Sequence, residues 1–199
     1  MRSRRVTGVV LAAGRSRRLG SPKQLLPYGG TTLLDATLEV ARRCGFDQLI
    51  VTLGGALEQV LAEVNLGGVE AVIARDFGAG CSASLRAAIA HVDADADGIV
   101  LLLGDQPGIH PDDVLRVVAS CGEAELAVCR YSDGVGHPFW LGRSLFEELE
   151  RLRGDKAVWK LVDRARAGGS LVEVPVGGAI PLDVDTWADY ERLLASVAP

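Results

Sequence analysis

The sequence predicts a single α/β domain whose sheet is mainly parallel. Short apolar runs alternate along the chain with longer stretches that have helical periodicity. This alternation is satisfied most simply by right-handed βαβ units. No internal repeat or low-complexity linker interrupts the pattern, and a length of 199 residues suits one domain. We therefore expect residues 1–199 to form one unit.

Four strands and four helices are expected in the first part of the chain. The first strand is a mostly β-branched apolar run ended by Gly14, which is typical of strands buried on both faces of a sheet. Thr31 or Thr32 can cap the next helix, and Gly45 can stop it. The expected strands cover residues 6–11, 48–53, 69–74 and 98–103. The expected helices cover about 32–44, 56–64 and 82–91, and a fourth begins within 110–113, where two acidic residues suit the helix dipole.

The second part of the chain is expected to add two more strands and further helices. The segment from Gly134 to Trp140 returns close behind a strand. Thr186 can cap a final helix that reaches Leu194. The other expected elements are a strand over residues 126–131, an amphipathic stretch over 145–153, a helix to about 166 and a strand over 171–175.

Composition favours a soluble globular protein. The chain is 48% hydrophobic and 24% charged, which argues against disorder, and its net charge of −5 argues against a general nucleic-acid or membrane surface. The arginines at positions 2, 4 and 5 precede no apolar segment or small-residue cleavage site, so we expect a cytoplasmic protein. The four cysteines are widely spaced, without a C-x-x-C pair, and indicate free thiols rather than a zinc site or disulfides. They are Cys44, Cys81, Cys121 and Cys129.

The segment over residues 6–26, VTGVVLAAGRSRRLGSPKQLL, combines a strand with a loop of small and basic residues. The loop leaves the C-terminal edge of the strand, where open α/β sheets bind ligands. Small residues let backbone N–H groups approach an anion, and arginine and lysine suit phosphate oxygens. These residues are Ala12, Ala13, Gly14, Gly20, Arg15, Arg17, Arg18 and Lys23. A polyphosphate is the expected ligand; the alternative is a glycine-rich turn with a solvated basic tip.

Two common phosphate-binding motifs are excluded by spacing. A Walker A loop requires glycines five residues apart with lysine directly after the second. Here Gly14 and Gly20 are six apart, and two residues separate Gly20 from Lys23. The dinucleotide fingerprint G-x-G-x-x-G is also absent from the sequence.

Three aspartates are candidate metal ligands. Asp105 directly follows the fourth expected strand, in the string GDQP, and so lies at the same sheet edge as the basic loop. Mg²⁺ takes one or two protein carboxylates together with phosphate oxygens and water. Asp183 and Asp185 are two apart, so both carboxylates face one side of an extended chain. A turn at Asp105 and a helix start capped by Thr186 are the alternatives.

A second loop of small residues, RDFGAGCSASL over residues 75–85, precedes a helix. Its helix N-terminus offers unpaired N–H groups, and the hydroxyls of Ser82 and Ser84 can read a base or a ribose. The alternative is a tight turn with Ser82 as an ordinary N-cap.

Three ring-bearing residues are weaker candidates. His137 could contact a phosphate, but a lone histidine in a turn is more often a structural hydrogen-bonding residue. Trp140 and Trp159 can stack on a ligand ring or fill the core, and we favour the core for both.

The pattern L-A-A-G-x-S-x-R-x-G-x-x-K, from Leu11 to Lys23, resembles the signature of the MobA-like nucleotidyltransferases. LAAG followed by SPKQLLPYGG looks most like the molybdenum cofactor cytidylyltransferase branch. The resemblance implies that the backbone of Leu11, Ala12, Ala13 and Gly14, with Arg18 and Lys23, holds a nucleotide triphosphate.

Later segments are similar to further family motifs, in the same order. The second loop resembles N-P-x-W-x-x-G-M-x-S-S-L, in which Gly80 and Ser84 match, whereas Ala74 and Arg75 replace the Asn-Pro pair. GDQP resembles the metal-binding element, and the segment at Asp183 and Asp185 resembles D-I-D-T, which completes the metal site with one or both aspartates. The G-H-P segment places His137 near a pterin acceptor. The string GDKAVW lacks the glycine, alanine and arginine of the family's G-D-x-G-A-R element.

The resemblance implies a three-layer α/β/α fold with a Rossmann-like, mainly parallel sheet of the nucleotide-diphospho-sugar transferase type. It also implies Mg²⁺-dependent transfer of a nucleotidyl group, from CTP to molybdopterin, with release of pyrophosphate. Arg18, Lys23 and Asp105 would be the catalytic residues. A molybdoenzyme or a chaperone would be a protein partner. The alternatives are transfer from GTP or to another phosphorylated acceptor, an oxidoreductase on the same scaffold, and a non-catalytic nucleotide-binding protein.

Overall fold

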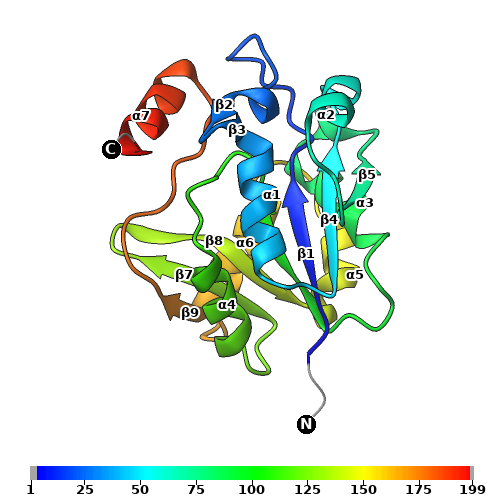
Figure 1. Ribbon diagram of the computed structural model, residues 1–199. Helices are drawn as coiled ribbons and strands as arrows, with labels where there is room; N and C mark the ends of the chain where they lie inside the picture. Colours follow the sequence, from blue (N-terminus) through cyan, green and yellow to red (C-terminus); the bar gives the residue numbers. More distant parts are fainter. Residues whose placement is uncertain (1–3, 198–199) are drawn as a thin grey trace.

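A computed structural model describes residues 4–197 and contains a seven-stranded sheet with helices on both faces (Figure 1). Residues 1–3 and 198–199, which include Arg2, lie outside this description. The strands are β1 (Val6–Leu11), β4 (Gln48–Leu53), β5 (Glu70–Ile73), β6 (Gly98–Leu103), β7 (Leu126–Tyr131), β8 (Gly134–Gly142) and β9 (Val172–Pro175), and a separate two-stranded sheet holds β2 (Pro27–Tyr28) and β3 (Thr31–Thr32).

Seven α-helices and three short 3₁₀ helices connect these strands in the described chain. The α-helices are α1 (Leu33–Arg43), α2 (Leu57–Glu63), α3 (Cys81–Ile89), α4 (Pro111–Ser120), α5 (Phe146–Arg151), α6 (Ala157–Ala167) and α7 (Trp187–Val197). The 3₁₀ helices are η1 (Lys23–Leu25), η2 (Phe77–Ala79) and η3 (Arg143–Leu145). The expected cap at Thr32 is present, because its hydroxyl accepts a hydrogen bond from the Asp35 N–H at 3.1 Å.

The sheet is mixed but mainly parallel, in the order β5-β4-β1-β6-β8-β7-β9. β1 lies between β4 and β6, and Val9 is in register with Ile50 on one side and Leu101 on the other. β8 is antiparallel to both of its neighbours, β6 and β7. It runs antiparallel to β7 because only two residues separate the two strands and so close a hairpin. The expected parallel α/β architecture is confirmed, with β8 as an antiparallel exception.

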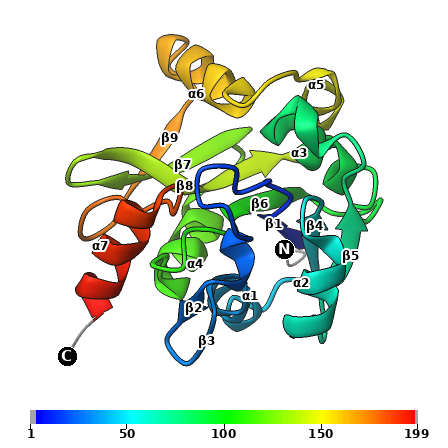
Figure 2. The same cartoon turned by 90° about the horizontal axis from the view of Figure 1, so that it is seen from above.

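Helices cover both faces of the sheet and give the molecule three layers (Figure 2). Alternate residues of β1 point to opposite faces, so Val10 packs with α1, α2 and α4, whereas Val9 packs with α3, α5 and α6. The apolar faces of both helical layers are therefore buried on one central sheet.

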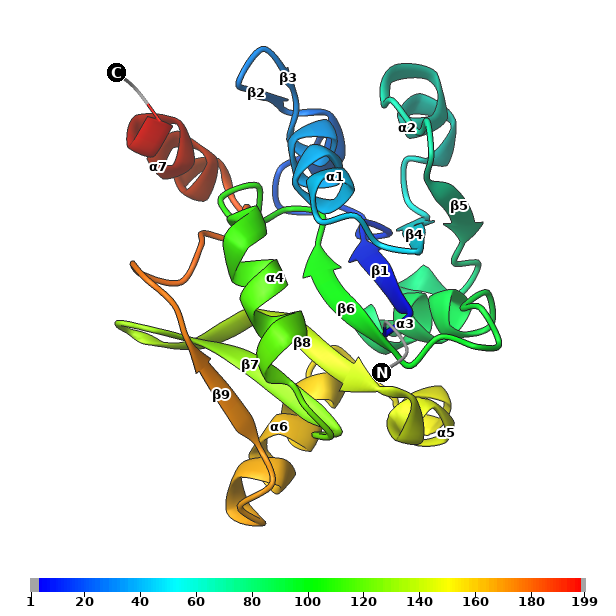
Figure 3. The ribbon, with the colours of Figure 1, turned by 60° about the horizontal axis from the view of Figure 1, so that its bottom comes forward.

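Helix α7 packs away from the sheet, against the chain that follows β1 (Figure 3). Leu193 of α7 lies in one apolar cluster with Leu19 and Leu26. The indole N–H of Trp187 donates to the Leu19 carbonyl at 3.1 Å, and the Tyr190 hydroxyl donates to the Pro27 carbonyl. The C-terminal helix therefore holds the basic loop from its outer side.

The β2–β3 hairpin was not expected from the sequence. Its two turn residues, Gly29 and Gly30, have φ of 58° and 84°, which is the left-handed conformation that a type I′ turn requires. The Gly-Gly pair was the available signal, but the flanking strands of two residues were too short to show a periodicity.

No helix within residues 4–197 is long and apolar enough to cross a membrane.

Candidate active site

A cavity of about 810 Å³ opens at the C-terminal ends of β1 and β6. Figure 2 looks down on this edge, where the loop after β1 lies between α3 and the C-terminal segment. All of the residues predicted for the nucleotide and metal sites line it: Leu11, Ala12, Ala13, Gly14, Arg18, Lys23, Gly80, Ser84, Asp105, Asp183 and Asp185. The structure therefore brings together residues that are up to 174 positions apart, from Leu11 to Asp185.

The loop after β1 presents a row of unpaired backbone donors. The buried side chain of Gln24 donates to the carbonyls of Ala12 and Gly14, at 2.6 and 3.0 Å, and so fixes the direction of the loop. The N–H groups of residues 13–18 donate to no group within the described chain. Successive free N–H groups of this kind form a concave site for an anion.

Ser16 shapes the turn of the same loop. Its φ of 51° makes it the one non-glycine residue in the described part of the chain with a positive φ. The Ser16 hydroxyl accepts a hydrogen bond from the Lys23 N–H at 2.8 Å, and its carbonyl accepts from the N–H groups of Leu19 and Gly20. Backbone strain of this kind is characteristic of ligand-binding loops.

Lys23 links the loop to two of the predicted aspartates. Its ammonium bonds Asp105 directly and lies 3.0 Å from Asp185 Oδ1, while Arg18 Nη2 lies 2.7 Å from Asp185 Oδ2. Burial alone would lower the pKa of Lys23, but the Asp105 and Asp185 carboxylates outweigh it and raise this pKa above its usual value. Lys23 therefore stays charged, with only 15% of its side chain exposed, whereas 66% of the Arg18 side chain is exposed.

The segment around Asp183 is held beside Asp105 by hydrogen bonds. Gln106, which is 2% exposed, donates to the Pro181 carbonyl at 3.0 Å, and the Val184 N–H donates to the Asp105 carbonyl at 3.2 Å. Burial, and then the charges of Asp105 and Asp185, raise the pKa of Asp183 to about 6. The Asp183 carboxylate therefore takes up a proton more readily than an ordinary aspartate does.

The three aspartates have the right donor chemistry for a hard divalent cation, but they are not arranged as a closed cluster. Within residues 4–197, no group of three His, Cys, Asp or Glu side chains is placed to hold a metal ion. The Lys23 ammonium bridges Asp105 and Asp185 instead, and Asp183 makes no ion pair with any described residue. Carboxylate oxygens that are released by Lys23 would suit Mg²⁺ or Mn²⁺.

The N-terminus of α3 forms a second wall of the cavity. Gly80 precedes it with a φ of 99°, and a Cβ there would lie 2.6 Å from Asp155 Oδ1. The same Asp155 oxygen accepts a hydrogen bond from the Cys81 N–H at 3.0 Å. Burial, and then the charges of Asp155 and Asp105, raise the pKa of Cys81 to about 11, so its thiol is protonated at neutral pH and is not a nucleophile there.

His137 does not line the cavity. Its ring is stacked on Phe139 with centroids 4.0 Å apart, and burial lowers its pKa to about 3. The imidazole is therefore neutral, and its predicted contact with an acceptor has no support from the described geometry. Trp140 is 2% exposed and belongs to the core as favoured, whereas Trp159 is half-buried: it packs against the core and also lines the cavity.

Sequence reasoning missed several residues of the cavity wall. Arg15 lies over the Phe77 ring, with its guanidinium carbon 4.7 Å from the ring centroid, and was recognised only as part of the positive charge of the loop. Gln24 stands inside the SPKQLL string, but nothing local indicated that its amide would turn back to the loop. Asp155 matches the aspartate of the family's G-D-x-G-A-R element, whereas Trp159 stands where the arginine of that element is expected, which was a signal of changed acceptor recognition.

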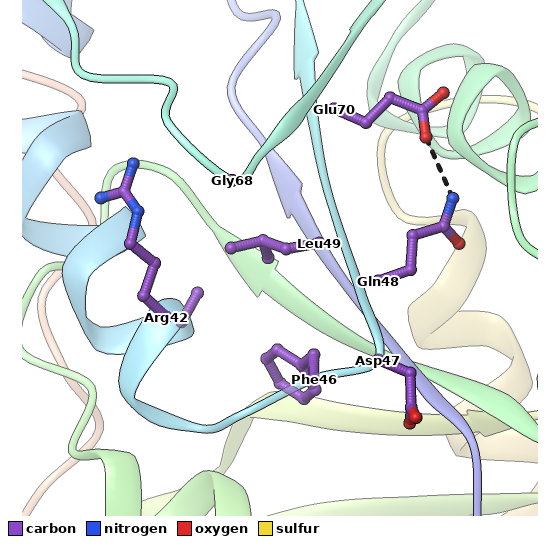
Figure 4. Close-up of a pocket in the computed structure, with 8 residues that line it drawn as sticks. Arg42, Phe46, Asp47, Gln48, Leu49, Gly68 and Glu70 are labelled. Carbon is purple, nitrogen blue, oxygen red and sulfur yellow. Dashed lines mark hydrogen bonds between the residues drawn. The ribbon is translucent and has the colours of Figure 1, made fainter.

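A second hollow, of about 320 Å³, lies at the N-terminal end of β4, beside Gln48 and Leu49 (Figure 4). Its polar groups already have partners: Gln48 donates to Glu70 and to the His91 carbonyl, at 3.0 and 2.8 Å, and the Asp47 carboxylate accepts from the Val6 N–H at 2.8 Å. Arg42 donates to backbone carbonyls at the rim. This hollow is explained as part of the structure and not as the active site.

Comparison with known proteins shows what the chain is similar to. The model of the MobA-like NTP transferase domain matches residues 8–169. Purine catabolism protein PucB of Bacillus subtilis is 29% identical over 97% of this chain and 98% of its own. Nicotine blue oxidoreductase of Paenarthrobacter nicotinovorans is 36% identical, and a probable molybdenum cofactor guanylyltransferase of Opitutus terrae is 31% identical; the matches cover 64% and 65% of this chain and 62% of each relative.

Solved structures agree with this result. A homologue of the protein Rv0371c from Mycobacterium sp. strain JC1 is 58% identical with a TM-score of 0.91, over 96% of each chain. Rv0371c of Mycobacterium tuberculosis in complex with manganese is 55% identical with a TM-score of 0.87, over 97% of this chain and all of its own. A nucleotidyl transferase of Methanothermobacter thermautotroptrophicus, 24% identical over 96% of this chain and 97% of its own, shares the fold with a TM-score of 0.80.

Proposed function

Because the chain belongs to the MobA-like NTP transferase family and is a nucleotidyltransferase, we propose that its cavity transfers a nucleotidyl group from an NTP to a phosphorylated acceptor. The observation that carries this proposal is the row of free N–H groups at residues 13–18, beside the charged side chains of Arg18 and Lys23. Backbone donors next to mobile cations match the oxygens of a triphosphate.

Binding would begin with exchange of ionic partners. The triphosphate would take the N–H groups of residues 13–18, and Lys23 and Arg18 would move from Asp105 and Asp185 to phosphate oxygens. The freed carboxylates of Asp105, with Asp183 or Asp185, would hold a divalent cation, which supplies positive charge to the phosphates when bound. We propose Mg²⁺ for this position; the relative from Mycobacterium tuberculosis was crystallised with manganese.

The chemical step would be a single substitution at phosphorus. An oxygen of the acceptor phosphate attacks the α-phosphorus of the NTP, its new O–P bond forms, and the bond to the β-phosphate breaks to release pyrophosphate. Lys23 and Arg18 would stabilise the charge that builds on the leaving group. An ionised phosphate needs no general base, so the protein's contribution is positioning and charge neutralisation.

We propose CTP as the donor and molybdopterin as the acceptor. Support comes from the LAAG loop with SPKQLLPYGG and from the relative named as a probable molybdenum cofactor guanylyltransferase. GTP is kept as the alternative donor for two reasons. That relative is named a guanylyltransferase, and Ala74 and Arg75 replace the family's Asn-Pro pair in this chain. A redox role is the second candidate, favoured only by the similarity to nicotine blue oxidoreductase.

Calorimetric titration of CTP, GTP, ATP and UTP with Mg²⁺ tests the proposal, using wild type, Asp105→Ala and the control Asp163→Ala. Asp163 is an acidic residue on α6 with 74% of its side chain exposed. Selective CTP binding that weakens only in Asp105→Ala is the expected result, followed by pyrophosphate release on addition of molybdopterin. Preference for GTP would change the donor, absence of NTP binding would contradict the transfer reaction, and tight NADH binding would favour the redox role.

A further inference from the structure

Trp159 differs from the two other tryptophans of the chain. The indole N–H of Trp140 donates to the Ala124 carbonyl at 3.0 Å, and that of Trp187 donates to the Leu19 carbonyl at 3.1 Å. The Trp159 indole N–H has no partner among residues 4–197. A half-buried indole usually finds a partner for this group, so the Trp159 donor is available to a ligand.

The orientation of the Trp159 ring is fixed from one side. Phe139 and His137 are stacked on each other at 4.0 Å, and Trp159 is nearly perpendicular to both, at 5.1 and 6.2 Å between centroids. These two separations are too similar for the indole to lie on the axis of the stack, so it lies beside the pair. The contacts with Phe139 and His137 therefore hold the indole on one side, while Trp159 also lines the cavity.

The other aromatic ring of the cavity wall is already covered. The Arg15 guanidinium lies over the Phe77 ring at 4.7 Å from its centroid. Trp159 stands at the start of α6, three residues after Lys156 at its N-cap, whereas the basic loop follows β1. The Trp159 ring and the basic loop are thus contributed to the cavity lining by different elements.

We propose that Trp159 is the stacking platform for a planar heteroaromatic ring carried by the acceptor, and that its indole N–H donates to a polar atom beyond the edge of that ring. This assignment rests on the proposed transfer reaction and names the chemical class of its acceptor. Stacking on an aromatic side chain is worth enough to select a ring-bearing acceptor over an aliphatic phosphate. The rigid support from Phe139 keeps the indole in place before the ligand arrives.

Equilibrium binding of neopterin, a soluble pterin, tests the platform in wild type, Trp159→Phe, Trp159→Leu and the surface control Leu115→Ala. Both replacements at Trp159 keep apolar contact with Phe139, but only phenylalanine keeps an aromatic face. We expect neopterin to bind Trp159→Leu at least about fivefold more weakly than wild type, and Trp159→Phe within about threefold. Binding of CTP with Mg²⁺ should stay within about twofold in all variants.

Three results would overturn the platform: wild-type affinity for neopterin in Trp159→Leu, an equal loss of CTP affinity, which would assign the ring to the nucleotide base, or no binding of neopterin by wild type at millimolar concentration. Thermal melting checks that the variants fold, and Trp159→Met replaces the leucine variant if that one unfolds. Failure of the transfer reaction is recognised separately, because wild type would then bind no NTP or would release no pyrophosphate from CTP and molybdopterin.

Discussion

At the scale of single residues, Lys23 determines which aspartates of the site are paired when no ligand is bound. Its ammonium lies between Asp105 and Asp185, where it satisfies the carboxylates that a divalent cation would otherwise bind. The same side chain is the least exposed cation of the basic loop. We expect it to leave the carboxylates when it pairs with a phosphate of the proposed nucleotide. Nucleotide and metal binding should therefore be coupled through the position of this one amine.

Replacing Lys23 with methionine should have opposite effects on the two ligands. Loss of the competing ammonium should tighten Mn²⁺ binding to the nucleotide-free protein by at least about fivefold. Loss of a charged hydrogen-bond donor should weaken NTP binding by at least about tenfold. Electron paramagnetic resonance of free Mn²⁺ and calorimetry of the NTP measure the two constants. Lys160→Met, at an exposed position on α6, is the control; unchanged or weaker Mn²⁺ binding in Lys23→Met would contradict the coupling.

Asp105 should matter for turnover more than for folding. Its carboxylate is the partner of Lys23 and the first candidate to hold the cation, while its backbone carbonyl holds Val184. Asp105→Ala keeps the backbone contact, so we expect a folded protein whose metal-dependent turnover falls by at least about tenfold, which is roughly 1.4 kcal/mol in the barrier. Steady-state pyrophosphate release measures the effect. Wild-type turnover in this variant would remove Asp105 from the mechanism.

The sequence was sufficient to predict those residues of the cavity lining that belong to a local pattern. Arg18, Lys23 and Asp105 are contributed by a loop and a strand end, both of which are visible in the order of residue types. Gln24, Asp155 and Trp159 contribute through contacts made only after folding: two loop carbonyls, a helix end 74 residues away, and a pair of stacked rings. No local pattern specifies such partners, so Gln24 and Asp155 were not predicted as parts of the site, and Trp159 was considered as a stacking residue but assigned to the core.

At the scale of secondary-structure elements, helix α3 is capped from a distance. Its N-cap is Gly80, which has no side chain to satisfy the first N–H groups, and the Asp155 carboxylate takes that role for the Cys81 N–H. The cap joins the wall formed by α3 to the segment that leads into α6. Helix α1, by contrast, is capped by its own neighbour Thr32.

Asp155→Ala should therefore loosen the start of α3. We expect a loss of about 1 kcal/mol in the free energy of unfolding, together with faster amide exchange at residues 81–84. Denaturant unfolding and hydrogen exchange measure the two effects. Thr32→Ala is the matched control, because it should cost a similar free energy but leave exchange at α3 unchanged. Unaltered exchange in Asp155→Ala would show that the distant cap is not needed.

The positions of the elements were largely predicted because their signals are local. The strands over 6–11, 48–53, 98–103 and 126–131 have the predicted bounds, and the helices differ from prediction by a few residues at their ends. The direction of β8 was not predicted. Strand order depends on pairing between distant segments, and the two-residue turn after Tyr131 was interpreted only as a return of the chain.

At the scale of the whole molecule, the parallel strands and the antiparallel strand β8 contribute different parts of the cavity. The parallel strands β1 and β6 end at the basic loop and next to Asp105, whereas β8 carries Phe139, which contacts Trp159. The cavity lies where these parts meet, so one opening could take both ligands that we propose, a polyphosphate and an aromatic ring. Phe139 is fully buried, so the residue that supports the Trp159 ring also stabilises the core of the sheet.

That link predicts how stability depends on pH through His137, which is stacked on Phe139 and is 7% exposed. Burial lowers its pKa in the folded protein to about 3. A histidine in the unfolded chain has a pKa of about 6.5. Between these values the unfolded chain binds more protons, so the free energy of unfolding decreases as pH falls below 6.5. Near pH 5 the loss from this residue should be about 2 kcal/mol.

His137→Phe retains a ring on Phe139 and removes the titration. Denaturant unfolding at pH 7.5, 6 and 5 should therefore give a smaller decrease for the variant than for wild type, with the difference growing as pH falls. Any constant effect of the substitution on stability cancels, because the comparison is between the two slopes. Groups that titrate elsewhere in the molecule contribute to both proteins alike. Equal decreases in the free energy of unfolding of both proteins would mean that His137 takes up its proton in the folded state. The assignment of a neutral, buried imidazole would then be wrong.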